Sequence, residues 1–375
     1  MKMRLKSLQY SQYDTQPRAW RLEDCTFGDI NLVVGQNATG KTRTLQAISE
    51  LANLLSGDRK LNVASGSFDA VFDHNGYQKY VLKWANKNVV QEEFIQNGRT
   101  LLQRGADGTG KIFAARVQLE LDFHSPSDKL AVVSRRDAIQ HPFLESLYSW
   151  GKAARYFRFG TAMGQEHLAV FEAGSPQEEL NLKDSNQAVI IFQKGKAKYG
   201  SDYVRLIVDD MKKIGYELED ILIQEMGWIG NKRALSGISV KEKELAAMTY
   251  HHEISSGMFR ALSLIIQLNY SLLASLPSCI IIDDIGEGLD YIRSTALIEL
   301  LIKKVEDTTR NVQLIMSTND RFVMNSVPLK YWSVIRRFPH KAKFYNYRNS
   351  KPLFDEFEFT GLSNFDFFSS NYLES

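Results

Sequence analysis

Residues 35–42, with the sequence GQNATGKT, carry the residue types and spacing best suited to bind phosphate. In the pattern GxxxxGK[ST], backbone N–H groups of a loop surround phosphate oxygens, and the lysine adds positive charge at the terminal phosphates. Lys41 is that lysine, and the hydroxyl of Thr42 is a suitable ligand for Mg²⁺. The pattern therefore predicts a site for ATP and Mg²⁺. The residues expected to contact the nucleotide here are Gly35, Asn37, Ala38, Thr39, Gly40, Lys41, Thr42 and Arg43.

A phosphate loop has physical meaning only between a strand and a helix, and both are predicted here. Residues 30–34 form a short apolar run typical of a buried strand. Leu45, Ile48, Leu51 and Leu55 then share one face of a helix. A second segment, residues 105–111, repeats the glycine and lysine spacing, but an isoleucine replaces the hydroxyl residue and no helix is predicted after it. We predict a hairpin turn there.

Two carboxylates, Asp283 and Asp284, end the apolar run of residues 280–282. A strand that ends in this way suits magnesium-dependent phosphoryl transfer. Asp283 is expected to hold the metal together with Thr42, and Asp284 to polarise the attacking water. A strand that simply ends in polar surface residues is the alternative, and the phosphate loop argues against it.

A Ser-Ser-Gly segment, Ser255 to Gly257, precedes a long apolar segment. A serine hydroxyl, free backbone N–H groups and the helix dipole together favour an anion at such a helix start. An ordinary serine cap is the alternative.

These motifs, in this order, resemble those of ABC-type ATPases. Residues 280–290 resemble the Walker B motif and the D-loop, and residues 253–260 resemble the ABC signature. The resemblance implies an ATP-closed homodimer in which the signature contacts a nucleotide bound to the other subunit. It assigns nucleotide contacts to Ser255, Ser256, Gly257 and Asp290.

The resemblance also implies catalytic roles for Lys41, Asp284 and Asn319. Asn319 stands where the family has a switch histidine; it can bond a γ-phosphate but cannot become charged. Asp284 stands where the family usually has glutamate, so we expect slow hydrolysis. No glutamine of the Gln-loop can be placed.

The resemblance covers residues 5–52 and 253–327 and is nearest to the chromosome-maintenance (SMC) and DNA-repair branch. Stand-alone ATPases of bacterial phage-defence operons are similar in size and in the DD-x-GEGLD sequence. The implied function is a sensor or regulator that acts with a separate effector protein. The alternatives are a repair-type ATPase that binds DNA directly, a transporter subunit, and a nucleotide-gated scaffold with negligible turnover.

The elements around these motifs predict an α/β fold: a P-loop NTPase core with an antiparallel β flank and an inserted mixed lobe. Residues 67–123 alternate with a period of two between turn signals, which indicates a meander of hairpins. A helix is expected at residues 203–214. Strand and helix then alternate: strands at residues 279–282 and 312–316, and a helix at 291–305. The predicted division is 1–130 and 251–375 for the ATPase lobe and 131–250 for the insertion.

Composition excludes several classes of protein. The chain of 375 residues is 44% hydrophobic, so it can bury a core. Its net charge of +2 is too small to give an overall electrostatic field that would attract nucleic acid. Two distant cysteines argue against a disulfide framework or a zinc knuckle. We expect a cytoplasmic protein without signal peptide or membrane span; the nearest candidate span, residues 258–276, contains polar side chains.

Other features favour plain structural interpretations. His251, His252 and Glu253 are not expected to bind metal, because neighbours on a strand point to opposite faces. Three basic stretches with aromatic residues, 152–158, 194–199 and 336–351, could bind nucleic acid, but solvated surface charge is the simpler interpretation. Residues 354–372 are expected to pack on the ATPase lobe or on a partner.

Overall fold

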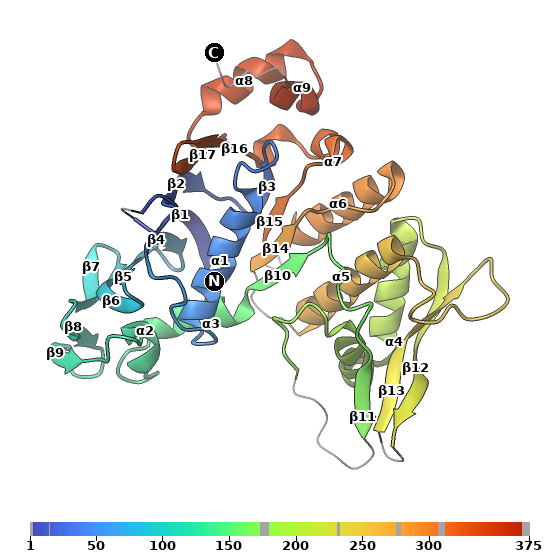
Figure 1. Cartoon of the computed structure of the whole chain (residues 1–375), viewed down its shortest axis with the longest axis horizontal. Coiled ribbons are helices and arrows are strands. Elements are labelled where there is room, and N and C mark those ends of the chain that lie inside the picture. The colour runs from blue at the N-terminus through green and yellow to red at the C-terminus, as the bar shows by residue number, and fades with distance from the viewer. Residues whose placement is uncertain are drawn as a thin grey trace.

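The computed structural model describes residues 3–14, 16–172, 180–230, 233–274, 279–306 and 312–369. Within them, a 14-stranded sheet forms the body of the molecule, and a three-stranded sheet lies apart from it (Figure 1). The described part contains no helix long and apolar enough to cross a membrane.

Five strands at one end of the large sheet run parallel. In spatial order they are β10 (Arg155–Arg158), β14 (Cys279–Asp283), β15 (Gln313–Ser317), β3 (Ile30–Val34) and β16 (Trp332–Phe338). Every residue of β14, β15 and β3 is buried, as expected for strands covered on both faces. Because these strands are parallel, their carboxyl ends share one edge of the sheet. The phosphate loop follows β3 at that edge, and Asp283 and Asp284 lie at the end of β14 there.

The rest of the large sheet is mainly antiparallel. After β16 come β17 (Lys341–Asn346), β2 (Trp20–Thr26), β1 (Arg4–Gln12), β4 (Ser65–Asp73), β5 (Tyr77–Ala85), β6 (Asn88–Gln96), β7 (Arg99–Arg104), β8 (Thr109–Ala114) and β9 (Leu119–His124). From β4 to β9 each strand pairs antiparallel with the next, which confirms the predicted meander. The second glycine and lysine segment begins in the turn between β7 and β8 and ends on β8, so the predicted hairpin is confirmed.

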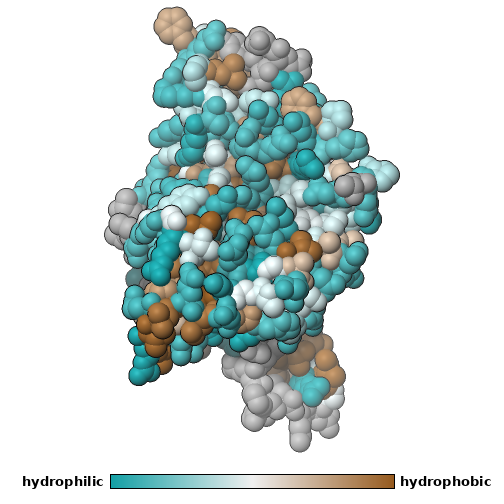
Figure 2. Space-filling model, turned by 90° about the vertical axis from the view of Figure 1, so that its left-hand side faces the viewer, coloured by the Kyte–Doolittle hydropathy of each residue, from teal (hydrophilic) through white to brown (hydrophobic). Residues whose placement is uncertain are grey.

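The meander ends in the edge strand β9, which is almost entirely exposed. Leu119 and Leu121 lie on it with 62% and 40% exposure. The side of the molecule shown in Figure 2 is otherwise mainly hydrophilic, with hydrophobic residues gathered low on the face.

Helices cover both faces of the parallel strands. On one face, α1 (Lys41–Leu55) and α3 (Leu144–Ala153) pack together, with the short α2 (Ala131–Ser134) beside α3. The four apolar residues predicted to face the core from α1 are all buried there. The other face is covered by α6 (Tyr291–Glu306), which bears out the predicted helix.

The small sheet has the order β11 (Ala169–Glu172), β13 (Arg233–Glu242) and β12 (Leu218–Ile229). It packs with α4 (Ala188–Lys213), which also contacts α5 (Ser256–Leu273). Helix α4 is interrupted at Gly200, and its second half is the helix predicted at residues 203–214. The predicted division at residues 130 and 250 stays a prediction; β10 lies in the large sheet, and α5 packs against α4.

The C-terminal segment contains α7 (Arg321–Ser326), the 3-10 turn Leu329–Tyr331, α8 (Lys351–Thr360) and α9 (Asn364–Ser369). Phe354, Phe357 and Phe367 are buried in the same core as Trp332, so the described part of the predicted C-terminal packing is confirmed. Residues 370–372 lie outside the described residues.

One structural assumption was wrong: residues 251–253 lie in a turn, not on a strand. The ring of His251 is buried, and its Nδ1 accepts a hydrogen bond from Ile238 N at 3.1 Å. Among the described residues, no group of three or more His, Cys, Asp or Glu side chains could hold a metal.

Candidate functional site

The phosphate-loop segment lies between β3 and α1, as the motif requires. Gly40 precedes the first helical residue with a φ of 112°, which a residue with a side chain adopts only under strain. Arg337 donates to the Ala38 carbonyl at 3.1 Å and ties the loop to β16. The loop residues 37–43 line a cavity of about 570 Å³, together with Asp284 and Asn319.

Lys41 is held inside the loop. Its Nζ donates to the Gly35 carbonyl at 2.7 Å and to the Gln36 carbonyl at 3.1 Å, and the residue is only 6% exposed. Burial lowers the pKa of Lys41, whereas Asp284 and Asp283 oppose this by favouring its charged form. Lys41 is thus a buried cation that is bonded to backbone carbonyls and stabilised electrostatically by Asp284 and Asp283.

Three hydroxyl groups converge on the carboxylate of Asp283. Ser317 Oγ and Thr42 Oγ1 donate to Asp283 Oδ1 at 2.6 and 3.2 Å. Tyr156 OH donates to Asp283 Oδ2 at 3.2 Å. These groups come from β15, α1 and β10, so the shared edge of the parallel strands assembles them.

The donor set at Asp283 fits Mg²⁺. This ion prefers hard oxygen ligands in octahedral geometry at about 2.0–2.1 Å, which puts neighbouring ligands about 3.0 Å apart. The Thr42 and Asp283 oxygens are 3.2 Å apart, close to that spacing.

Asp284 has an unusual backbone conformation. Its φ is 55°, in the left-handed region, and its N–H donates to Ser317 Oγ at 3.1 Å. Burial raises the pKa of the Asp284 carboxyl, as do Asp283 and Glu287, while Lys41 and Arg158 lower it. A half-buried carboxylate with a raised pKa, facing a phosphate loop, can accept a proton from water.

The Ser-Ser-Gly segment begins α5. Ser255 caps the helix, with its Oγ accepting from Met258 N at 3.4 Å, and both serines are exposed. Gly257 packs so closely against the Gly288 carbonyl that a Cβ would lie 2.8 Å from its oxygen. Only a glycine fits there without displacement of the backbone.

Within one chain this segment does not meet the phosphate loop. Ser255 and Gly257 line a separate cavity of about 460 Å³, together with Asp290 and Arg293. Asp290 forms an ion pair with Arg293, whose hydrogen bonds lower the pKa of the Asp290 carboxyl. The predicted site residues thus fall into two groups on one chain.

Several residues at the site were missed in the sequence. Trp20 also lines the cavity, and the predicted Arg43 stacks over its ring with 4.3 Å between guanidinium carbon and ring centre. Tyr156 lies in the basic stretch 152–158, which was interpreted as solvated surface charge; that interpretation was wrong for Arg155, which is only 5% exposed. Ser317 directly precedes Thr318 and Asn319, so its position after a predicted strand was the available signal.

No protein-family model matches this chain, and no curated protein matches it. Among solved structures, the fold is similar to an SMC head bound to the C-terminal winged-helix domain of ScpA, with a TM-score of 0.51 and 13% identity over 91% of this chain and 97% of that chain. An SMC head domain from Thermotoga maritima has 15% identity, a TM-score of 0.45, and coverage of 92% and 98%. An SMC head from Pyrococcus furiosus, with an extended coiled coil and bound to the C-terminal domain of ScpA, has 10% identity, a TM-score of 0.48, and coverage of 95% and 100%. The chain therefore has the α/β fold of an SMC head, which is an ABC ATPase fold.

Proposed function

We propose that this chain binds ATP with Mg²⁺ and hydrolyses it slowly. The observation that carries the proposal is one cavity that contains the phosphate loop and Asp284, with Asp283 bonded to Thr42 beside it. On ATP binding, the Lys41 ammonium would break its hydrogen bonds to the two carbonyls and would itself neutralise charge on the terminal phosphates. Thr42 and Asp283 would hold Mg²⁺, which supplies positive charge to the phosphate oxygens when bound.

Asp284 would orient the attacking water and accept its proton. Asn319 lines the same cavity and can donate a hydrogen bond to a phosphate oxygen or to the water. The aspartate side chain is one methylene shorter than glutamate, so its carboxylate reaches less far. Small misplacement of a catalytic group costs on the order of a hundredfold in rate, which is why we expect slow turnover.

The test is Lys41→Ala. The variant loses the ammonium charge placed to meet the terminal phosphates, so we expect ATP binding or hydrolysis to be abolished. The measurement is ATP affinity by calorimetry together with steady-state hydrolysis. The matched control is Lys304→Ala, which removes another largely buried lysine, 12% exposed and paired with Asp210 at 2.6 Å, away from the loop. Wild-type affinity and rate in Lys41→Ala would overturn the proposal.

We further propose that two chains close around ATP. Support comes from the separation, within one chain, of the Ser255 to Gly257 segment from the phosphate loop. Both serines are exposed at the start of α5, where a helix N-terminus favours an anion. A second chain could bring this segment to the nucleotide of the first.

The biological role proposed for this ATPase is that of a regulator in phage defence, which acts with a separate effector protein. It rests on the resemblance of the motifs alone. The experiment is a phage challenge of cells that carry the natural operon with wild-type protein or Lys41→Ala. Equal phage resistance in both strains would count against an ATP-dependent defence role. In a separate assay of ATP hydrolysis by the protein, stimulation by added DNA would favour the repair-type alternative.

A further inference from the structure

A second polar cavity, of about 980 Å³, lies at the opposite end of α1 from the phosphate loop. It is lined by Asn53 and Asp58 on one side and by Lys152, Arg155 and Lys183 on the other. It shares no lining residue with the phosphate-loop cavity. From Lys41 to Asn53 the helix rises about 18 Å at 1.5 Å per residue, so a small ligand held by Lys41 does not reach Asn53.

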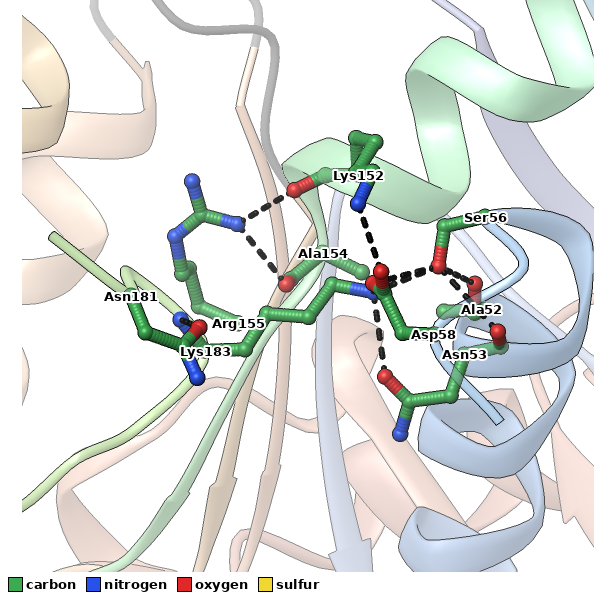
Figure 3. A network of polar contacts seen from close by, with 9 residues as sticks. All are labelled: Ala52, Asn53, Ser56, Asp58, Lys152, Ala154, Arg155, Asn181 and Lys183. Atoms are coloured by element: carbon green, nitrogen blue, oxygen red, sulfur yellow. Dashed lines mark hydrogen bonds and ion pairs between the residues drawn. The ribbon is translucent and has the colours of Figure 1, made fainter. Parts of the chain in front are cut away.

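Arg155 is a buried cation at this cavity. It begins β10, is 5% exposed, and donates from one guanidinium nitrogen to the carbonyls of Lys152 and Ala154 at 2.7 and 3.0 Å (Figure 3). Its Nε is buried without a hydrogen-bond partner. None of the ion pairs found among the described residues joins Arg155 to a carboxylate. A buried guanidinium with an unused donor is costly unless an acceptor arrives.

Two lysines lie beside it and share one carboxylate. Lys183 reaches across to α1 and donates to Asp58 Oδ2, Ser56 Oγ and Asn53 Oδ1 at 2.8, 2.9 and 3.0 Å (Figure 3). Lys152 donates to the other oxygen of Asp58 at 2.5 Å. The side chain of Lys183 is 17% exposed, whereas that of Lys152 is 45% exposed and can turn toward a ligand.

The charges at this cavity do not balance. The lining contains two carboxylates, Asp58 and Asp184, and four cations, Arg59, Lys152, Arg155 and Lys183. The C-terminal ends of α1 and α3 add about half a negative charge each, which leaves about one positive charge. Burial lowers the pKa of Lys183, the hydrogen bond and attraction to Asp58 oppose this, and repulsion from Lys152 and Arg155 adds to the lowering. Burial also lowers the pKa of Arg155 to about 10. An anion in the cavity would relieve both effects.

We propose that this cavity is a second anion site that binds a small phosphorylated molecule through Arg155, Lys152 and Lys183. A guanidinium beside two ammonium groups matches the charge and the acceptor geometry of a phosphate group. The volume lies within the about 300–1,000 Å³ typical of small-molecule pockets. A nucleic-acid backbone instead needs a row of exposed cations along its path, and two of these three are mostly buried.

The test uses the full chain with Lys41→Ala, in which the phosphate loop has lost its lysine. Calorimetric titration with pyrophosphate should detect one binding site per chain. Addition of Lys183→Gln, or of Arg155→Gln, should weaken pyrophosphate binding by about tenfold or more, because each removes a positive charge from the cavity. Thermal melting checks that each variant is folded; if Arg155→Gln does not fold, Lys183→Gln decides.

Lys304→Gln is the matched control. Its lysine is similarly buried and paired with Asp210 at 2.6 Å, so its loss should leave pyrophosphate affinity unchanged. Three results would overturn the inference: no binding of pyrophosphate to Lys41→Ala at millimolar concentration, unchanged pyrophosphate affinity in Lys183→Gln, or binding of a single-stranded oligonucleotide only. Because hydrolysis by the wild-type protein is not the readout, failure here leaves the proposed ATPase function intact.

Discussion

At the scale of single residues, Asp284 combines a left-handed backbone with a carboxyl pKa raised by burial and by two acidic neighbours. We predict that Asp284→Asn lowers the single-turnover rate of ATP hydrolysis by about a hundredfold or more, because an amide cannot accept a proton from water. ATP and Mg²⁺ should still bind through Lys41 and Asp283. The measurement is single-turnover hydrolysis beside a calorimetric ATP titration.

Glu287 provides the control for that prediction. It is exposed, and Gly160 packs against its side chain. Glu287→Gln should hydrolyse ATP at close to the wild-type rate. If instead Asp284→Asn keeps the wild-type rate, Asp284 is not the base, and Glu287 becomes the next candidate.

The pKa of Asp284 also predicts a pH dependence. Only the ionised carboxylate can accept a proton, and its pKa in the folded chain lies above 3.8. The single-turnover rate should therefore decline, as pH falls, at a higher pH than an ordinary aspartate would give. A rate profile measured under conditions where the fold persists checks this; a residual rate in Asp284→Asn that falls over the same pH range would assign the titration to another group.

At the scale of elements, Glu92 on β6 ties the meander to α2. Its carboxylate accepts from the Ala131 and Val132 amides at 2.7 and 3.0 Å and from Tyr80 OH at 3.1 Å, and it lies 3.6 Å from Arg104, with no exposure of either charged side chain. Glu92→Leu should lower the free energy of unfolding by about 3–5 kcal/mol, because it leaves a buried cation and two helix N–H groups unpaired.

Urea unfolding measures that loss of stability. The neighbouring Glu93→Leu is the control, since Glu93 is only partly buried and its side chain accepts a hydrogen bond from Gln91. We expect a much smaller change there. Equal loss of stability in the two variants would mean that the Glu92 contacts do not anchor α2.

At the scale of the whole molecule, the two groups of site residues predict an obligatory second chain. Ser256 is exposed at the start of α5, so Ser256→Arg fits on one chain but would place bulk and charge in the proposed interface. ATP binding by the monomer should be unchanged, whereas ATP-dependent dimerisation and hydrolysis should be lost. Light scattering during size exclusion, with and without ATP, measures ATP-dependent dimerisation.

Mixing experiments sharpen this prediction. Ser256→Arg chains contribute an intact phosphate loop, and Lys41→Ala chains contribute an intact Ser-Ser-Gly segment. A mixture should recover at most one working site per dimer, although each variant alone is inactive. Normal hydrolysis by Ser256→Arg alone would rule out a site shared between chains.

The sequence by itself determined the features that depend on local chemistry. A buried strand, a glycine-containing loop and a helix with a periodic apolar face are specified by neighbouring residues, so β3, α1 and the loop between them were predictable. The same holds for the hairpins from β4 to β9, whose turns and alternation are local signals.

Only the tertiary structure decided which distant side chains meet. Tyr156 and Ser317 reach Asp283 because β10, β14 and β15 lie side by side in parallel register, and no local pattern specifies the neighbour of a strand. Arg155 is another example. Its basic stretch suggested surface charge, but the residue is buried because β10 enters the large sheet. Burial and charge balance depend on packing between segments far apart in the chain, which is why the second anion cavity had no signature in the sequence.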